Sequence, residues 1–172
     1  MNSSIKPVGW TLFVRITHWL VAICVVINFF NDTGFWHRTI GYICISIVCI
    51  RILYGLLISK ATSSRLYFPG ISSLKLHAKE LLNKQVPAYA GHNPFGQWAV
   101  YLMWLLIALL AVSGWLSRTD ALWGEDWPVD LHMALSNVLQ GVVVLHLLAV
   151  SLMSKLQKHN LVKAMIVGKE QI

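Results

Sequence analysis

The sequence predicts an all-α protein, a bundle of four transmembrane helices in one domain. Its composition is the first indication, because 56% of the 172 residues are hydrophobic and only 12% are charged. Soluble domains usually carry about 25% charged residues. The mean hydropathy of +0.62 is the second indication. The third is that the hydrophobic residues gather in four runs of about 20 residues, the length needed to cross a hydrocarbon core about 30 Å thick.

We expect the four helices at about residues 12–30, 39–58, 95–116 and 131–153. Helices are favoured because backbone polar groups inside a membrane must be satisfied within each segment. Glycine, proline, asparagine and aspartate, which favour turns, separate the four runs. Residues 1–172 then form one integral membrane domain, with residues 59–94 as its long middle connection. We expect a short helix on the membrane surface within this connection, at residues 73–84.

The positions of lysine and arginine predict the orientation of the bundle. Eleven of the fourteen lie in or near the N-terminus, the middle connection and the C-terminal tail. The first and third connections hold only Arg38 and Arg118, together with five acidic residues. We therefore expect both termini and the middle connection on the cytoplasmic side, and the acidic third connection on the outer side.

Several other classes of protein are disfavoured. The net charge of +7 does not indicate a nucleic-acid partner, because the basic residues lie between apolar runs rather than on one face of a folded domain. We expect the four spans to be surrounded by membrane lipid. The three cysteines, Cys24, Cys44 and Cys49, lie inside apolar runs, and the chain contains no CxxC or CxxCH motif. A disulfide framework, a zinc site and covalently attached c-type haem are therefore not expected.

Four histidines lie at matched depths in the predicted spans. His18 and His146 are each about 10 Å from the same membrane face, at 1.5 Å of rise per residue. His37 and His132 share the outer level, at the starts of their spans. The fourteen residues from His132 to His146 correspond to about 21 Å of rise and place both within about 40° of one helix face. Each level thus offers two histidines that can face each other across one cofactor.

Two histidines per level suit haem iron better than zinc. Structural zinc takes four ligands, commonly including thiolates, whereas haem iron takes two axial ligands and imidazole is a standard one. Two axial histidines leave no open iron position, so oxygen binding at the metal is disfavoured. The pattern favours outer-sphere electron transfer.

Three further residues are candidates for the cofactor sites. Gly41 and Gly141 remove side chains where a porphyrin needs room, although each could equally allow close helix packing. Arg51 lies inside an apolar run, fourteen residues after His37 and near the level of the inner pair. Arginine can bind a haem propionate through a bidentate fork; the alternative is that it extends its charge towards the membrane surface.

The remaining histidines carry weaker expectations. We interpret His77 and His159 as solvated residues. His92 could cap the third span, contact a propionate or line a quinone pocket. Arg38, His92 and Trp36 are the candidate neighbours of a quinone headgroup.

Four short motifs resemble the bacterial cytochrome b561 family, which includes the b-type cytochrome subunits of nickel-iron hydrogenases. They are RITHW at 15–19, HRTIG at 37–41, RILYG at 51–55 and GHNPFG at 91–96, followed by His132 and His146. The similarity covers nearly the whole chain. The hydrogenase subunits typically have one span more than the four predicted here.

This resemblance implies a four-helix bundle in the bacterial inner membrane that holds two b-type haems between its helices. His18 and His146 would bind the iron of the cytoplasmic haem, and His37 and His132 that of the outer haem. The resemblance further implies electron transfer between quinone and a periplasmic redox protein such as a c-type cytochrome, either as an oxidoreductase or as a subunit of one. The oligomeric state is left open, a homodimer included.

Two alternatives stay open at this stage. A superoxide oxidase would pass electrons from superoxide to quinone, but it calls for a positive outer surface to collect an anion, and the outer connections are acidic. A haem-free four-helix membrane adaptor, whose histidines relay protons, would not require histidines at matched depths.

Overall fold

The computed structural model describes residues 9–58, 64–83 and 91–168, and they form helices and turns with no strand. This confirms the predicted all-α class. In chain order, the elements are α1 (Leu12–Phe30), α2 (Gly34–Leu53) with a π-helical continuation (Tyr54–Ile58), α3 (Ile71–Leu82), α4 (Pro94–Leu116), a short 3-10 turn (Asp120–Leu122), α5 (Trp127–Leu156) and α6 (Leu161–Val167).

Four of these helices are long and apolar enough to span a membrane: α1, α2 with its π-helical turn, α4 and α5. The predicted spans match them, apart from their ends. The helix α2 begins at Gly34, five residues before the expected start, because the residues around His37 continue the helix beyond the apolar run. The helix α5 begins earlier as well, at Trp127, with Pro128 in its first turn, where proline costs no hydrogen bond.

The short helix expected at residues 73–84 is α3, which begins at Ile71 and ends at Leu82. Residue 84 lies outside the described residues. The helix packs against α4 and buries His77, which is only 1% exposed. The expectation that His77 is solvated is therefore wrong. Its ring lies 5.6 Å from that of Phe95 at the start of α4, between ring centres, and its Nδ1 contacts a carboxylate oxygen of Glu80 at 3.2 Å.

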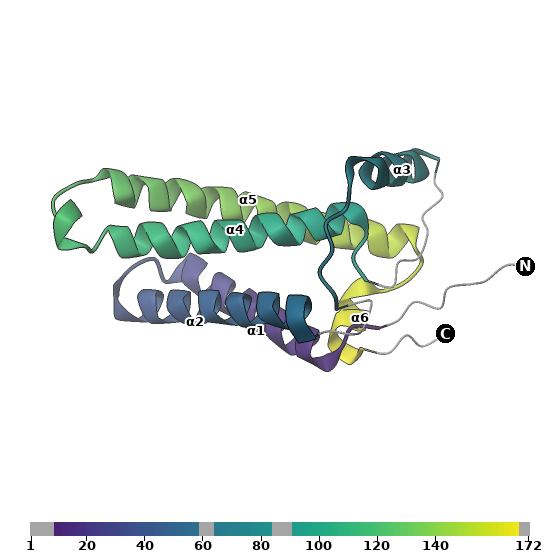
Figure 1. Ribbon diagram of the computed structural model, residues 1–172, viewed down its shortest axis with the longest axis horizontal. Coiled ribbons are helices and arrows are strands. Elements are labelled where there is room, and N and C mark those ends of the chain that lie inside the picture. Colours follow the sequence, from purple (N-terminus) through teal and green to yellow (C-terminus); the bar gives the residue numbers. More distant parts are fainter. Residues whose placement is uncertain (1–8, 59–63, 84–90, 169–172) are drawn as a thin grey trace, which may run out of the picture.

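The long helices form two antiparallel pairs, α1 with α2 and α4 with α5, and the pairs meet mainly through α2 and α4. Figure 1 shows α3, α6, the start of α1 and the end of α5 at one end of the bundle. We call this the terminal end. The α1–α2 and α4–α5 connections lie at the opposite end, which we call the far end.

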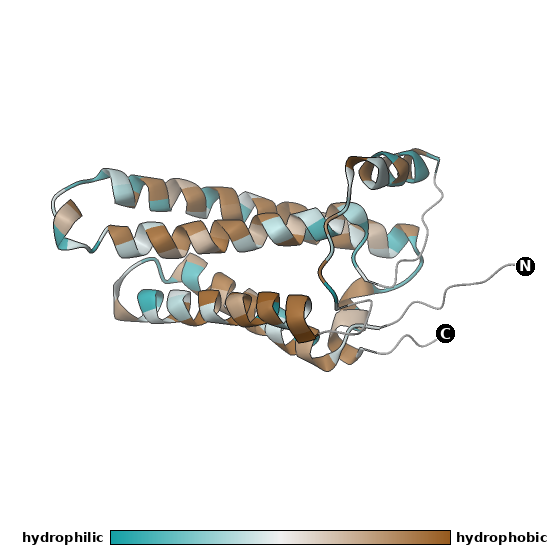
Figure 2. Cartoon of the chain, viewed as in Figure 1, coloured by the Kyte–Doolittle hydropathy of each residue, from teal (hydrophilic) through white to brown (hydrophobic). Residues whose placement is uncertain are grey.

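The core is small and lies where α2, α4 and α5 meet. Its buried residues are Cys44, Val48, Leu106, Ile107 and Leu139. Figure 2 shows that the long helices are hydrophobic over most of their length and hydrophilic mainly near their ends. Most of their large apolar side chains are exposed. Soluble proteins rarely expose apolar patches of this extent, so lipid must cover these faces.

The helix α6 is held against the start of α1 by two side chains. Arg15 donates from Nη1 to the carbonyl of Val167 at 3.0 Å, and Trp19 donates from Nε1 to the carbonyl of Met165 at 3.3 Å. These carbonyls belong to the last turn of α6, where a helix has no partners of its own. Gly168 ends the helix in the left-handed conformation, at a φ of 75°.

Replacing Gly168 by alanine should loosen this junction. The left-handed backbone costs a non-glycine residue about 1 kcal/mol or more, and an added Cβ would overlap the Arg15 guanidinium. Gly124→Ala is the matched control, because Gly124 has a similar φ of 87° but no atom within 4 Å of an added Cβ. In thermal unfolding of the detergent-solubilised protein, Gly168→Ala should lose more stability than Gly124→Ala. Equal losses would show that the Arg15 contact contributes nothing.

Candidate functional site

His37 of α2 and His132 of α5 face each other at the far end of the bundle. Their ring centres are 5.9 Å apart, and their ring planes are inclined by 72°. Both side chains are partly buried. The two helices come from different pairs, so the contact joins the α1–α2 pair to the α4–α5 pair.

Hydrogen bonds orient both rings and fix which nitrogen carries the proton. The Nδ1 of His37 lies 2.6 Å from the carbonyl oxygen of Asn31, and a carbonyl can only accept, so Nδ1 is protonated. The Nδ1 of His132 lies 3.0 Å from the hydroxyl of Ser113. That hydroxyl donates to the Leu110 carbonyl at 3.2 Å, so its oxygen accepts from the ring. In the neutral form of both histidines Nε2 therefore keeps its lone pair, the state that a metal ligand requires.

A cavity of about 80 Å³ adjoins the pair and is lined by both histidines. Gly41 also lines it, and a Cβ at this position would meet only the Asn28 side chain, at 3.6 Å. The predicted placement of Gly41 beside a histidine pair therefore matches the fold. Its other lining residues come from α1, α2, α4 and α5 and include Cys24, Phe29, Cys44, Ile107, Ala111, Ser136 and Leu139.

The structure does not bring Gly141 to this pair. It lies nine residues after His132, which is half a turn away around the helix at 100° per residue. It is exposed, and a Cβ there would meet no atom within 4 Å. Gly141 therefore faces away from the far-end cavity.

His18 of α1 and His146 of α5 share the terminal end. Each is partly buried, and they are close enough for their charges to interact. The Nδ1 of His18 is buried and has no hydrogen-bond partner among the described residues. Since native structures rarely leave a buried polar atom unpaired, this ring is a candidate for binding a group that the chain does not itself supply.

Arg51 lies buried at the same end. It is 7% exposed and donates from Nη2 to the carbonyl of Ser64 at 3.1 Å. The centre of its guanidinium lies 5.8 Å from the ring centre of Trp104, within the range of a cation–π interaction. Its Nη1 is buried without a partner.

His92, in the segment before α4, joins this cluster. Its ring lies 4.5 Å from that of Trp10. Burial, together with the charges of Arg51, His18 and His146, lowers the pKa of His92 to about 3, so the ring is neutral at physiological pH. The helix cap is not His92 but Asn93, whose side chain accepts from the backbone of Gly96 at 2.7 Å.

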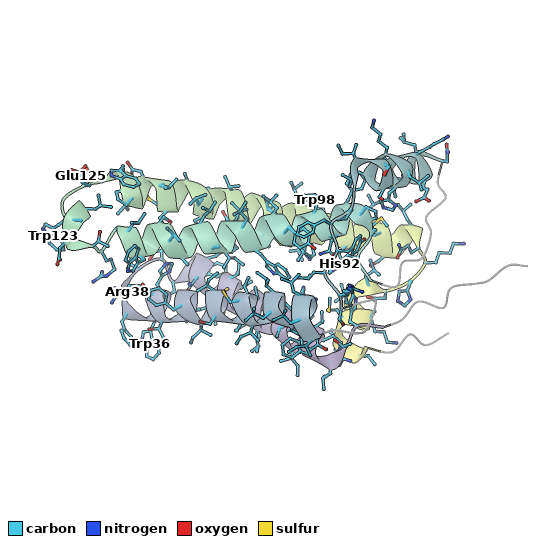
Figure 3. The ribbon with its side chains drawn as sticks, in the orientation of Figure 1. Trp36, Arg38, His92, Trp98, Trp123 and Glu125 are labelled. Atoms are coloured by element: carbon cyan, nitrogen blue, oxygen red, sulfur yellow. The ribbon has the colours of Figure 1, made fainter. Side chains whose placement is uncertain are left out.

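Figure 3 shows His92 at the terminal end and Trp36 and Arg38 at the far end. The three residues considered for a quinone headgroup therefore cannot belong to one site. Only His92 lies with Arg51, and only Trp36 and Arg38 lie near the His37 level.

The sequence analysis missed the residues of α4 that support His132. Ser113 is buried and fixes the ring, and Gly114 lies directly against it, because a Cβ at Gly114 would come within 3.2 Å of the His132 ring. The sequence feature that could have indicated this contact is the pair of small residues Ser113 and Gly114 near the end of the third apolar run. Small residues allow helices in a membrane to approach closely.

Four apolar helices that bring histidines together in pairs define a membrane protein of the b-type cytochrome class. A comparison with protein-family models agrees, since the model for prokaryotic cytochrome b561 matches residues 9–168. The protein belongs to this family. Neither the curated proteins nor the solved structures contained a match. Membership implies haem b and membrane electron transfer, and it disfavours the haem-free alternative.

The far-end pair fits the axial ligands of a haem. With metal–imidazole bonds of about 2 Å, two histidines on opposite sides of one iron have ring centres about 6 Å apart, and the observed value is 5.9 Å. The cavity beside them is smaller than the roughly 300 Å³ at the lower limit for small-molecule pockets. A macrocycle therefore needs more room than this cavity provides.

Adding a side chain at Gly114 should damage the far-end site. We expect Gly114→Val to push His132 away from Ser113 and His37, and to lower the ratio of haem to protein. Gly141→Val is the matched control, since it makes the same change at a glycine with open surroundings. Pyridine haemochrome assays on both purified variants measure the ratio. Equal haem content in the two variants would contradict the role assigned to Gly114.

Proposed function

We propose that this protein is a di-haem b-type cytochrome that transfers electrons between membrane quinone and a periplasmic redox partner such as a c-type cytochrome. The observation that carries the proposal is the pair His37 and His132, whose spacing and free Nε2 atoms suit the axial ligation of haem. The second level, His18 and His146, supports a second haem. Quinone is the partner that the resemblance to the family implies.

Haem, when bound, supplies a one-electron carrier. His37 with His132, and His18 with His146, would hold the two haems. Ser113 and the Asn31 carbonyl orient the far-end rings, which limits the structural change that electron transfer requires. The two levels are about 21 Å apart along α5 at 1.5 Å per residue, so together they connect the two membrane faces.

The distribution of charge supports a cytoplasmic terminal end. The described basic residues beyond the spans at this end include Arg65, Lys75, Lys79, Lys155, Lys158 and Lys163. Lys6, Lys60, Lys84 and Lys169 lie outside the described residues. By the positive-inside rule, this end faces the cytoplasm of a bacterial cell, and the far end faces the periplasm.

The acidic α4–α5 connection supports a cationic partner at the far end. Asp120, Glu125, Asp126 and Asp130 are all exposed, and Figure 3 shows Glu125 and Trp123 at this tip. Such a surface attracts a lysine-rich cytochrome c by charge complementarity. It repels superoxide, which is an anion, so the charge favours electron carriage over superoxide oxidation.

A reduced-minus-oxidised spectrum with a pyridine haemochrome count tests the haem content. We expect two b-type haems per chain in the wild type, and one in each of His18→Ala and His37→Ala, because each variant removes an axial ligand of a different haem. His159→Ala should keep both, since His159 lies beyond the spans. A wild type with no haem, or a His37→Ala variant that keeps its full haem content, would refute the two-site proposal.

Reversing charge at the tip should separate partner docking from haem chemistry. For Glu125→Lys combined with Asp126→Lys, we expect slower reduction of a lysine-rich cytochrome c at low ionic strength and a smaller dependence on salt. Reduction of the haems by a soluble quinol analogue should be unchanged. Stopped-flow absorbance measures both reactions. An unaltered rate with cytochrome c would place the docking surface elsewhere.

A further inference from the structure

Several buried nitrogen donors at the terminal end have no acceptor among the described residues, and two of them lie on helices that carry or adjoin the inner histidine level. These two are Nη1 of Arg51 on α2 and Nε2 of Gln97 on α4, and neither forms a hydrogen bond in the described part of the chain. Arg51 is 7% exposed and Gln97 only 2%. Native proteins rarely leave buried donors unpaired, so two of them at one end of a bundle indicate that a bound group supplies the acceptor.

The missing acceptor should be an anion. In the described part of the chain Arg51 forms no ion pair with aspartate or glutamate, and a buried guanidinium without a counter-charge is costly. Its Nη2 is already engaged by the Ser64 carbonyl, which leaves Nη1 for the ligand. A carboxylate has two oxygens, so it can accept from Arg51 with one and from a second donor with the other.

His92 links Gln97 to the Arg51 cluster. The Gln97 side chain hydrogen-bonds to the His92 ring and raises its pKa, so the ring donates and the Gln97 carbonyl oxygen accepts. The Gln97 side chain also lies beside the Tyr101 hydroxyl, but its Nε2 has no partner at hydrogen-bond distance. His92 in turn interacts electrostatically with Arg51, His18 and His146. The free donor of Gln97 therefore lies in the same cluster as Arg51 and the histidine pair.

The start of α4 adds to this preference for an anion. Asn93 caps the helix through the backbone of Gly96, and the backbone of Gln97 bonds to the Asn93 carbonyl at 2.9 Å. Gln97 is thus fixed in the first turn of a 23-residue helix, where the helix dipole is positive and favours negative charge.

We propose that Gln97, together with Arg51, binds one propionate carboxylate of the haem held by His18 and His146. The inference rests on the proposed function, because it needs a haem at this level. Gln97 donates to one carboxylate oxygen and Arg51 to the other, while His92 holds the Gln97 amide in position. Gln97 was not among the candidates that the sequence suggested.

The test is the rate at which this haem is lost to excess apomyoglobin. We would measure it in a His37→Ala background, which on the proposed function retains only the haem at the terminal end. Gln97→Glu keeps the size of the side chain and the oxygen that accepts from His92, but it replaces the donor by a negative charge. We expect haem loss to be faster by on the order of tenfold or more, as for loss of a hydrogen bond to a charged group.

Two further variants complete the test. Gln97→Leu removes the donor without adding charge and should accelerate haem loss less than Gln97→Glu. Gln140→Leu makes the same change at an exposed glutamine of α5 and should leave the rate unchanged. If Gln97→Glu does not accumulate as folded protein, the comparison of Gln97→Leu with Gln140→Leu decides the question.

Reconstitution with haem dimethyl ester, which lacks the carboxylates, distinguishes a propionate from another acceptor. With the ester, Gln97→Glu and its parent should lose haem at the same rate. A difference that persists with the ester, or wild-type rates for Gln97→Glu and Gln97→Leu with ordinary haem, would overturn the inference. Absence of haem from the His37→Ala parent would instead refute the ligand assignment in the proposed function.

Discussion

The need to satisfy polar groups inside an apolar bundle governs this structure. Water cannot serve them within the hydrocarbon region, so each buried ring nitrogen or guanidinium needs a partner on a neighbouring segment. His37 finds one in the Asn31 carbonyl, His132 in Ser113 and Arg51 in the Ser64 carbonyl. These bonds orient the side chains that the function uses. Where a partner is missing, at His18, Arg51 and Gln97, the gap indicates the position of a bound group.

The packing of the helices provides space for such groups. The core joins α2, α4 and α5, whereas α1 packs mainly against α2. The two histidine levels lie on either side of this core along α5, at His132 before Leu139 and at His146 after it. A bundle with a fully packed centre would have no room for macrocycles at two levels. The modest core is consistent with cofactors that complete the packing. Other helix bundles also build cofactor sites in their core from side chains on facing helices.

The sequence could predict those features that depend on local composition and helical periodicity. Runs of apolar residues predicted all four spans, and fourteen-residue spacing predicted that His132 and His146 share a face of α5. It failed where a neighbouring segment decides the environment. His77 lies on an amphipathic helix and was expected to be solvated, but α3 packs on α4 and buries it.

The sequence by itself determined that the chain has four apolar runs long enough to cross a membrane, that its histidines lie at two levels of these runs and that it resembles the cytochrome b561 family. These properties follow from hydrophobicity and from the fixed rise and rotation of an α-helix. Only the tertiary structure decided which groups meet: Ser113 and Gly114 at His132, and Gln97 and His92 at Arg51. Such contacts join residues far apart in the chain, and their existence depends on how the helix pairs are rotated and how closely they approach. No local pattern in the sequence specifies the rotation of the helix pairs or the distance between them.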